Sequence, residues 1–441
     1  MNFTKKILTA ALAVLFVLPA GAQNRIGFTE YDLDNGLHVI LHQDNTTPIV
    51  AVTISYHVGS KNEHPERTGF THFFEHLMFE GSEYIERGEF DKIAMNAGAS
   101  LNANTGFDRT FYYLLLPSNQ LELGLWMESE RMLHLRIDSI GVETQRSVVK
   151  EERKQSYENR PYGLIMENTF KMAFREHPYQ WTPIGSAESI NNATMEEFLE
   201  FHSIFYVPNN ATLSIAGDIS IEETKKLVAK YFADIPKGTK EIYRPSVKEP
   251  AKTAEVRDVM YDDVQLPALV QAYHIPAMGT PDFYALTMLT TLLSDGESSR
   301  MTKSIVDKQQ KALFVAAMPF PLEDPGLFMI MGIANAGISV DELEAAVDKE
   351  IELARNGDIS DREFEKIRNK IENDFVSRNS TMAGIAESLS DYHMYFGDAN
   401  LINTEIDRYL AVTKEDIVRV ARQYLTRENR VVLHCLPKQN Q

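Results

Sequence analysis

The sequence predicts an α+β fold of two homologous domains, each a mostly antiparallel sheet with helices packed on one face. Runs of strand-like segments are followed by runs of helix-like segments, which is typical of this class. The chain also repeats itself, because TMEEFLEFHSIFYVPNNATLSI from Thr194 aligns without gaps on TKEDIVRVARQYLTRENRVVLH from Thr413. Pro48 and Pro267 precede similar apolar segments at the same spacing. Two copies are too few for a solenoid, so we expect two related domains.

Composition and charge narrow the class of protein. Of the 441 residues, 44% are hydrophobic and 24% are charged, which excludes wholesale disorder. The formal net charge of −19 makes nucleic acid a poor partner. Cys435 is the single cysteine, so no internal disulfide can form and a large core must supply stability. Its strand-like surroundings, RVVLHCLP, favour a buried and inert thiol.

Residues 1–22 have the order of a secretory signal peptide. Lys5 and Lys6 precede the apolar run ILTAALAVLFVLPA, and small residues follow before Gln23. A membrane span is the alternative, but the run of about 14 residues is short of the roughly 20 that cross a bilayer. We expect cleavage after Ala22, a periplasmic or secreted protein, and no membrane span after signal removal.

The elements follow in order along the chain. Asn35-Gly36 lies between two alternating runs and predicts a hairpin. The segment 237–255 is rich in Pro and charge and predicts a linker between an N-terminal domain, 23–236, and a C-terminal domain, 256–441. The first domain is expected to contain a strand at 49–60, helix from about 69 to 95, a strand pair within 99–117, helices at 118–135 and about 139–157, a helix at 194–207, a strand at 211–218 and a helix at 220–236.

The segment GFTHFFEHLMFEGS, residues 69–82, contains the strongest functional signal. His72 and His76 are four residues apart, so they share one face of a predicted helix, and Glu75 borders the same face. Core histidines are the alternative, but three unpaired ionisable groups in an apolar run are costly. A bound metal removes that cost. The order H-x-x-E-H inverts H-E-x-x-H and indicates a zinc peptidase site.

A catalytic zinc needs a third protein ligand and an open position. Glu151 and Glu152 lie on a predicted helix in QRSVVKEERKQSYE. If Val148 and Val149 mark its buried face, Glu152 falls on that face and Glu151 is turned about 100° away. Both glutamates could instead be surface partners of neighbouring basic residues. Spacing alone leaves these alternatives open.

The chain resembles the pitrilysin/insulinase-type zinc metallopeptidases, or inverzincins, and is similar to their processing-peptidase-like bacterial members. The resemblance rests on H-x-x-E-H, on VVKEE with Glu152 in the ligand place, and on NANTGFDRTFYY, LELGLWMESERM, NRPYG and VPNNATLSIAGD. It covers nearly the whole mature chain. It implies one Zn²⁺ per chain held by His72, His76 and Glu152, with Glu75 as the catalytic base in an endopeptidase that cleaves peptides or unfolded segments.

The resemblance also implies how substrate binds. A peptide adds as a strand to an exposed sheet edge at ASLNANT, with Asn102 and Ala103 in the contact positions; an ordinary edge strand is the alternative. Relatives use an Arg and a Tyr from a second half to contact the substrate. Arg300 matches the first, but Phe314 stands where tyrosine is expected and has no hydroxyl to donate.

Phe314 therefore bears on assembly. The resemblance implies a homodimer, or a heterodimer in which a homologous chain supplies the Arg and Tyr, and Phe314 favours the heterodimer. The competing functions are a non-catalytic scaffold and a peptide-binding subunit of the same fold. All four zinc-site positions are present, which favours the peptidase.

Overall fold

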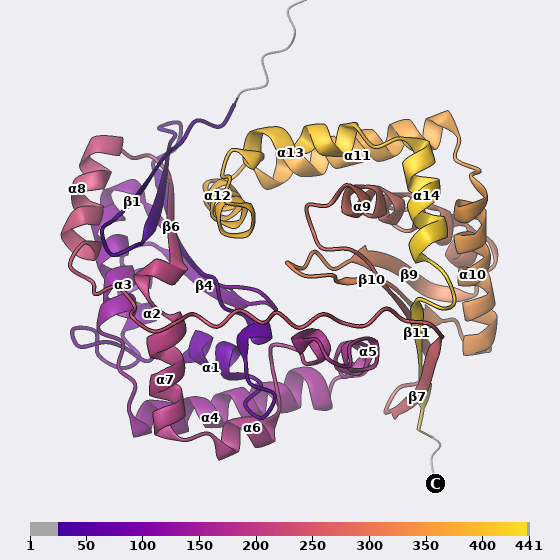
Figure 1. The fold of residues 1–441 in the computed structure, drawn as a ribbon, viewed down its shortest axis with the longest axis horizontal. Coiled ribbons are helices and arrows are strands. Elements are labelled where there is room, and N and C mark those ends of the chain that lie inside the picture. Colours follow the sequence, from indigo (N-terminus) through magenta and orange to yellow (C-terminus); the bar gives the residue numbers. More distant parts are fainter. Residues whose placement is uncertain (1–24, 439–441) are drawn as a thin grey trace, which may run out of the picture.

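The computed structural model describes residues 25–438, and the predicted signal peptide lies outside this range. Figure 1 shows two halves, each an open sheet with helices on its outer face. The extended segment between the halves crosses the middle of the view. Among the described residues, no helix is both long enough and apolar enough to span a membrane.

The first sheet has six strands in the order β1-β2-β6-β3-β5-β4. Neighbours are antiparallel except for β2 and β6, which are parallel. The strands are β1 (Thr29–Asp32), β2 (His38–Gln43), β3 (Ile49–Tyr56), β4 (Ser100–Thr105), β5 (Thr110–Pro117) and β6 (Ala211–Gly217).

The second sheet has five strands in the order β7-β11-β8-β10-β9, and only β7 and β11 are parallel. The strands are β7 (Val256–Asp262), β8 (Ala268–His274), β9 (Ala312–Pro319), β10 (Leu327–Ala334) and β11 (Arg430–Pro437). β3 and β8 begin at positions that differ by the same offset as Thr194 and Thr413. β6 and β11 also begin at positions that differ by this offset. The repeat seen in the sequence is therefore a repeat of topology, which confirms the predicted α+β fold of two homologous units.

The helices of the first half lie beside its sheet, except that one of them packs on the second sheet. They are α1 (Phe70–Leu77), α2 (Phe90–Asn96), α3 (Leu121–Leu133), α4 (Ser139–Arg153), α5 (Ile165–Ala173), α6 (Ala187–Asn192), α7 (Met195–Phe205) and α8 (Ile221–Phe232). The expected continuous helical stretch from 69 to 95 is broken between α1 and α2. Gly81 and Gly88, in the segment between the two helices, have φ of 107° and 73°, a left-handed backbone through which a right-handed helix cannot continue. Residues 154–158 continue α4 as one π-helical turn.

The second half repeats the helical layer. Its helices are α9 (Pro281–Leu293), α10 (Val340–Asn356), α11 (Asp361–Arg378), α12 (Met382–Phe396), α13 (Leu401–Leu410) and α14 (Lys414–Tyr424). The aligned residues Thr194 and Thr413 have the same role, because each caps its helix in a capping box, with Glu197 and Asp416 as partners. The repeat therefore extends to how the helices begin.

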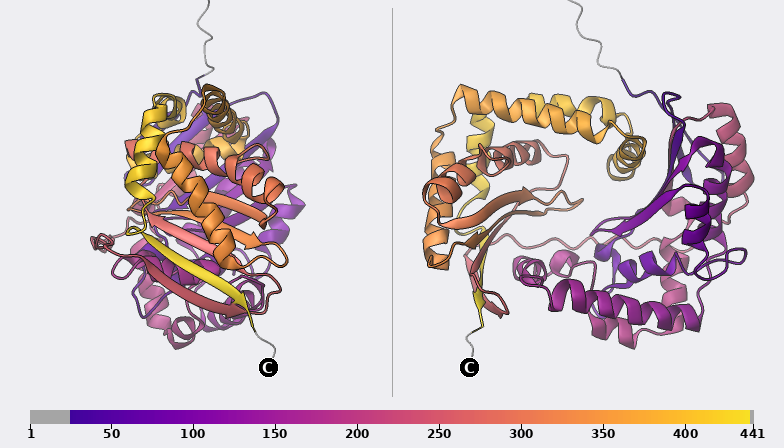
Figure 2. Two further views of the ribbon diagram at one scale, coloured as in Figure 1. Left: turned by 90° about the vertical axis from the view of Figure 1, so that its right-hand side faces the viewer. Right: turned by 180° about the vertical axis from the view of Figure 1, so that it is seen from behind.

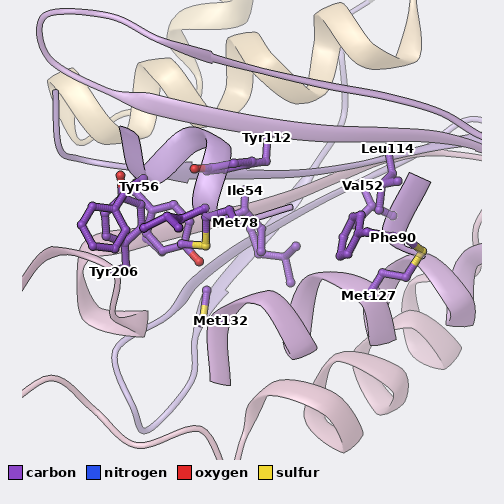
Figure 3. Packing of buried hydrophobic residues seen from close by; sticks show 14 of the residues in the cluster. Val52, Ile54, Tyr56, Met78, Phe90, Tyr112, Leu114, Met127, Met132 and Tyr206 are labelled. Atoms are coloured by element: carbon purple, nitrogen blue, oxygen red, sulfur yellow. The ribbon is translucent and has the colours of Figure 1, made fainter. Parts of the chain in front are cut away.

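The first core lies between the sheet and the helices on its outer face. Val52, Ile54 and Leu114 from the sheet pack in one layer with Phe90 of α2 and Met127 of α3 (Figure 3). All five side chains are fully or almost fully buried. This packing makes a rigid support under the helices that carry the candidate site.

The two halves exchange one helix each. α5 of the first half packs on β8 and β11 of the second sheet, and α12 of the second half packs on β3 and β6 of the first sheet. In Figure 1, and from behind in Figure 2, the helical layer of α11, α12 and α13 reaches from the second half towards the first sheet. α5 and α12 occupy equivalent places in the repeat, so the exchange is reciprocal.

Residues 237–255, the predicted linker, contain no helix or strand. The segment is nevertheless attached to the first half. Arg244 donates to the carbonyl of His57 at 2.7 Å, and the Glu249 carboxylate accepts the backbone N–H groups of Arg175, Glu176 and His177. These contacts hold the connection in one path between the halves.

Candidate metal centre

Helix α1 presents His72, Glu75 and His76 on one side and buries Phe73, Phe74 and Leu77 on the other. Its first turn is fixed from outside the helix. The buried Glu63 carboxylate accepts the N–H groups of Gly69 and Thr71, each at 2.8 Å, and so satisfies donors that a helix start leaves free. The apolar residues of the motif therefore anchor the helix, while its three ionisable residues face the other way.

Helix α4 brings Glu152 to both histidines. Glu152 Oε2 lies 3.2 Å from His76 Nε2 and 3.7 Å from His72 Nε2, and the three ligand atoms are all within 4.8 Å of one another. Glu151 is exposed and accepts instead from Gln155 at 2.7 Å. The structure thus brings together His72, His76 and Glu152 and turns Glu151 away.

The buried face of α4 is narrower than predicted. Val149 is 1% exposed, but Val148 is 43% exposed and lines the cavity beside the site. Two consecutive helical residues are turned about 100° apart, so a single buried stripe holds only one of them.

The protonation states suit a zinc ion. Burial, together with the neighbouring His76, lowers the pKa of His72 to about 4, which leaves its imidazole neutral at pH 7. The hydrogen bond from His76 lowers the pKa of the Glu152 carboxyl, which keeps it ionised. Two imidazoles and one carboxylate are one of the three-ligand sets that catalytic zinc sites use. The donor set therefore fits Zn²⁺.

Glu75 lies beside these ligands, but its carboxylate is hydrogen-bonded to a residue of strand β4. Its Oε2 accepts a hydrogen bond from Thr105 Oγ1 at 2.6 Å, and burial raises its pKa. Glu75 and His76 line a cavity of about 440 Å³ together with Asn102 and Ala103 of β4. A carboxylate that borders both the ligands and this cavity is placed to exchange a proton with a molecule bound there.

The sequence analysis did not identify Thr105. The alternation of side chains along a strand could have indicated it, because Leu101, Ala103 and Thr105 share the partly buried face of β4. We expect Thr105→Val to lower kcat roughly 10-fold, since a hydrogen bond to a charged group contributes about 1.5 kcal/mol. Thr105→Ser keeps the hydroxyl and should keep the rate. Steady-state kinetics on a fluorogenic peptide test this, and an unchanged kcat in the valine variant would contradict the contact.

Among the described strands, β4 forms one edge of the first sheet and pairs with β5 alone. The N–H of Ala103 is bonded to the side chain of Asn102 at 2.9 Å. Backbone groups that face away from the sheet on an edge strand can pair with an added chain. The structure thus places Asn102 and Ala103 on an open edge beside Glu75.

Arg300 and Phe314 lie in the second half. Arg300 Nε donates to Glu363 at 2.9 Å and lines a cavity formed by second-half residues, away from the cavity of Glu75 and His76. Phe314 is 40% exposed on the edge strand β9. Within one chain, the structure does not bring Arg300 to the candidate metal centre.

Comparison with known proteins settles the family. Residues 38–185 match the family model described as Insulinase (Peptidase family M16), and residues 192–371 match Peptidase M16 inactive domain. Zinc protease PqqE of Helicobacter pylori is 30% identical over 426 residues, which cover 95% of this chain and 96% of that protein. The chain belongs to peptidase family M16.

Solved structures share the fold of this chain. A protease from Helicobacter pylori has a TM-score of 0.90 at 30% identity and covers 94% of this chain and 100% of that chain. The periplasmic protease PqqL from Escherichia coli has a TM-score of 0.75 at 17% identity and covers 93% of this chain but 47% of that chain. The insulinase match includes H-x-x-E-H and Glu152, so the candidate centre lies in the half that resembles insulinase.

Proposed function

We propose that this M16 protein is an exported zinc-dependent endopeptidase that cleaves peptides or unfolded segments. The supporting observation is the convergence of His72, His76 and Glu152 from two helices, with Glu75 beside them and outside the ligand set. A site that only stored metal would have no use for a fourth ionisable group bordering an open cavity.

The residues have distinct tasks in this proposal. Zn²⁺ would be held by His72, His76 and Glu152 and would supply Lewis acidity at a peptide carbonyl and an activated water. Glu75 takes a proton from the attacking water and passes it to the leaving amine. Thr105 holds the carboxylate of Glu75 in place for both transfers.

Substrate class follows from the edge of the first sheet. A peptide that pairs with β4 near Asn102 and Ala103 would gain affinity from backbone hydrogen bonds, which make few demands on sequence. Only an extended segment can pair in this way. We therefore propose peptides and unfolded segments as substrates rather than folded domains.

Location and assembly complete the proposal. The composition of residues 1–22 and the periplasmic description of PqqL support a periplasmic or secreted protein. Phe314 cannot donate a hydrogen bond, and Arg300 lies away from the centre within one chain. The place of Arg300 supports a site that a second chain completes, in a homodimer or a heterodimer. Phe314 favours the heterodimer, because a second copy of this chain would also lack the tyrosine hydroxyl.

A digest of a mixed peptide pool at neutral pH tests the activity. We expect cleavage that a chelator abolishes and that added ZnCl₂ restores, because removing the ion removes its contribution of several kcal/mol at the transition state. The pure chain and the chain with a homologous partner should be compared. Chelator-resistant cleavage would refute the zinc mechanism. Bound zinc without turnover, even with the partner present, would favour a scaffold or a peptide-binding subunit.

A further inference from the structure

A second cavity, of about 430 Å³, borders the candidate metal centre at Glu152. It shares no lining residue with the cavity of Glu75 and His76, so two separate cavities meet the centre at two of its proposed ligands. One wall comes from the π-helical turn that continues α4 and from the loop after it, and another comes from β10 of the second half. The lining residues besides Glu152 include Ser156, Tyr157, Arg160, Tyr162, Gly163 and Met331.

The loop that lines this second cavity is held in one conformation. An added Cβ at Gly163 would collide with the carbonyl oxygen of Tyr157, so only glycine fits there. Tyr162 has φ of 63°, a left-handed backbone that tyrosine rarely adopts. The second half holds it there, because its N–H donates to Asp262 at 2.9 Å and its hydroxyl donates to the carbonyl of Leu266 at 2.8 Å. Backbone strain of this kind is concentrated at binding and catalytic sites.

Arg160 determines the charge of this cavity. Among the described residues that line it, the charged side chains are Arg160 and the proposed ligand Glu152. Arg160 forms no ion pair with another described residue, whereas Arg153 is paired with Glu158 and Glu167. A metal ion at the centre would oppose the charge of Glu152. The exposed guanidinium of Arg160 would then be the charge that a bound molecule meets in this cavity.

The cavity of Glu75 and His76 has the opposite charge. It is lined by the carboxylates of Glu75 and Asp91, and no described basic residue forms an ion pair with Asp91. A peptide bound across the metal centre would place side chains in both cavities. Its side chains would therefore meet carboxylates in one cavity and a guanidinium in the other.

We propose that the cavity of Arg160 is a specificity subsite that takes an acidic side chain of the peptide substrate. This inference rests on the proposed peptidase function and names a side chain that the site prefers. A guanidinium can donate two parallel hydrogen bonds to one carboxylate, and Arg160 has no ion-pair partner among the described residues that would compete. Met331 gives the second half of the chain a direct part in this subsite.

Peptide binding to the Glu75→Gln protein tests the subsite without turnover. The probes are fluorescein-labelled decapeptides that differ only in carrying one Asp, Asn or Lys, placed at each position in turn. We expect one position at which Asp lowers the dissociation constant about 10-fold relative to Asn, the size expected of a hydrogen bond between charged groups. The same difference should appear as anisotropy curves displaced along the protein concentration axis.

Charge reversal at Arg160 supplies the decisive comparison. Arg160 is exposed, so its replacement should leave the fold intact. Adding Arg160→Glu to the Glu75→Gln protein should make the Lys peptide the tightest at the selected position, and Arg160→Lys should keep a weaker preference for Asp. Lys171→Glu is the matched control, because Lys171 is exposed on α5 and lines neither cavity. It should keep the preference for Asp.

Equal binding of the Asp and Asn peptides at every position would overturn the subsite, and so would a preference for Asp that survives Arg160→Glu. Chelator-sensitive cleavage of peptides without any such preference would refute the subsite alone and leave the proposed peptidase function in place. A preference for Asp that Arg160→Glu reverses, in a protein whose parent cleaves no peptide, would support the subsite and refute the peptidase.

Discussion

Replacing Glu75 with glutamine is expected to abolish peptide cleavage while the zinc content stays that of the parent. The amide keeps the shape of the side chain and can still bond to Thr105, but it cannot accept the proton that attack by water releases. General acid–base catalysis contributes about 100- to 10,000-fold, so kcat should fall within that range. Glu75 is not among the three groups whose ligand atoms converge, so loss of metal is not expected.

The matched control for this change is Glu151→Gln. Glu151 carries the same charge one residue before a proposed ligand, but it is exposed and bonded to Gln155. Its loss should leave kcat near the parental value. Both variants are measured on one fluorogenic peptide, with zinc determined on the same preparations. A Glu75→Gln protein with parental activity would refute the assignment of Glu75 as the base.

Replacing His76 with alanine is expected to remove the zinc of this centre and, with it, measurable cleavage. Two ligands would remain where a catalytic zinc site uses three. The remaining Glu152 carboxylate would also lose the partner that lies 3.2 Å away and that lowers its pKa. Zinc content should fall by one ion per chain relative to the parent, and cleavage should fall to the level seen with chelator.

Circular dichroism shows whether the His76→Ala protein is folded. The His64→Ala protein is the control for loss of a histidine, because His64 is exposed and lies outside the candidate metal centre. Unchanged zinc content in a folded His76→Ala protein would exclude His76 as a ligand. Cleavage at the parental rate without zinc would exclude the metal mechanism altogether. The first result tests whether His76 is a zinc ligand, and the second tests whether cleavage requires zinc.

Local periodicity explains why much of the candidate site could be predicted. The spacing of His72 and His76 places both on one helix face whatever the rest of the fold does. Spacing left Glu151 and Glu152 as alternatives, and the choice of Glu152 came from the family resemblance. To predict the contact of Thr105 with Glu75, one must know where β4 lies relative to α1, and sequence spacing does not give this position. The break after α1 depends on the backbone conformations of Gly81 and Gly88, which the helical pattern masks.

Contacts between distant segments could not be predicted. The repeat indicated two sheets, but nothing in the local pattern of α5 or α12 shows that each covers the sheet of the other half. For the same reason, the sequence does not show that His38 of β2 lies against His393 of α12, because the two side chains meet only through that exchange. Arg300 matched a motif, yet its ion pair with Glu363 depends on the packing of the second half.

The exchange of α5 and α12 has a consequence for how the chain is made. The first sheet is complete once β6 has been synthesised at Gly217, but the face over β3 and β6 stays uncovered until α12 begins at Met382. Synthesis at roughly 5–20 residues per second makes this an interval of many seconds. The N-terminal half therefore cannot finish folding as an independent unit during synthesis. In a chain that is exported before it folds, both halves would already be present when folding begins.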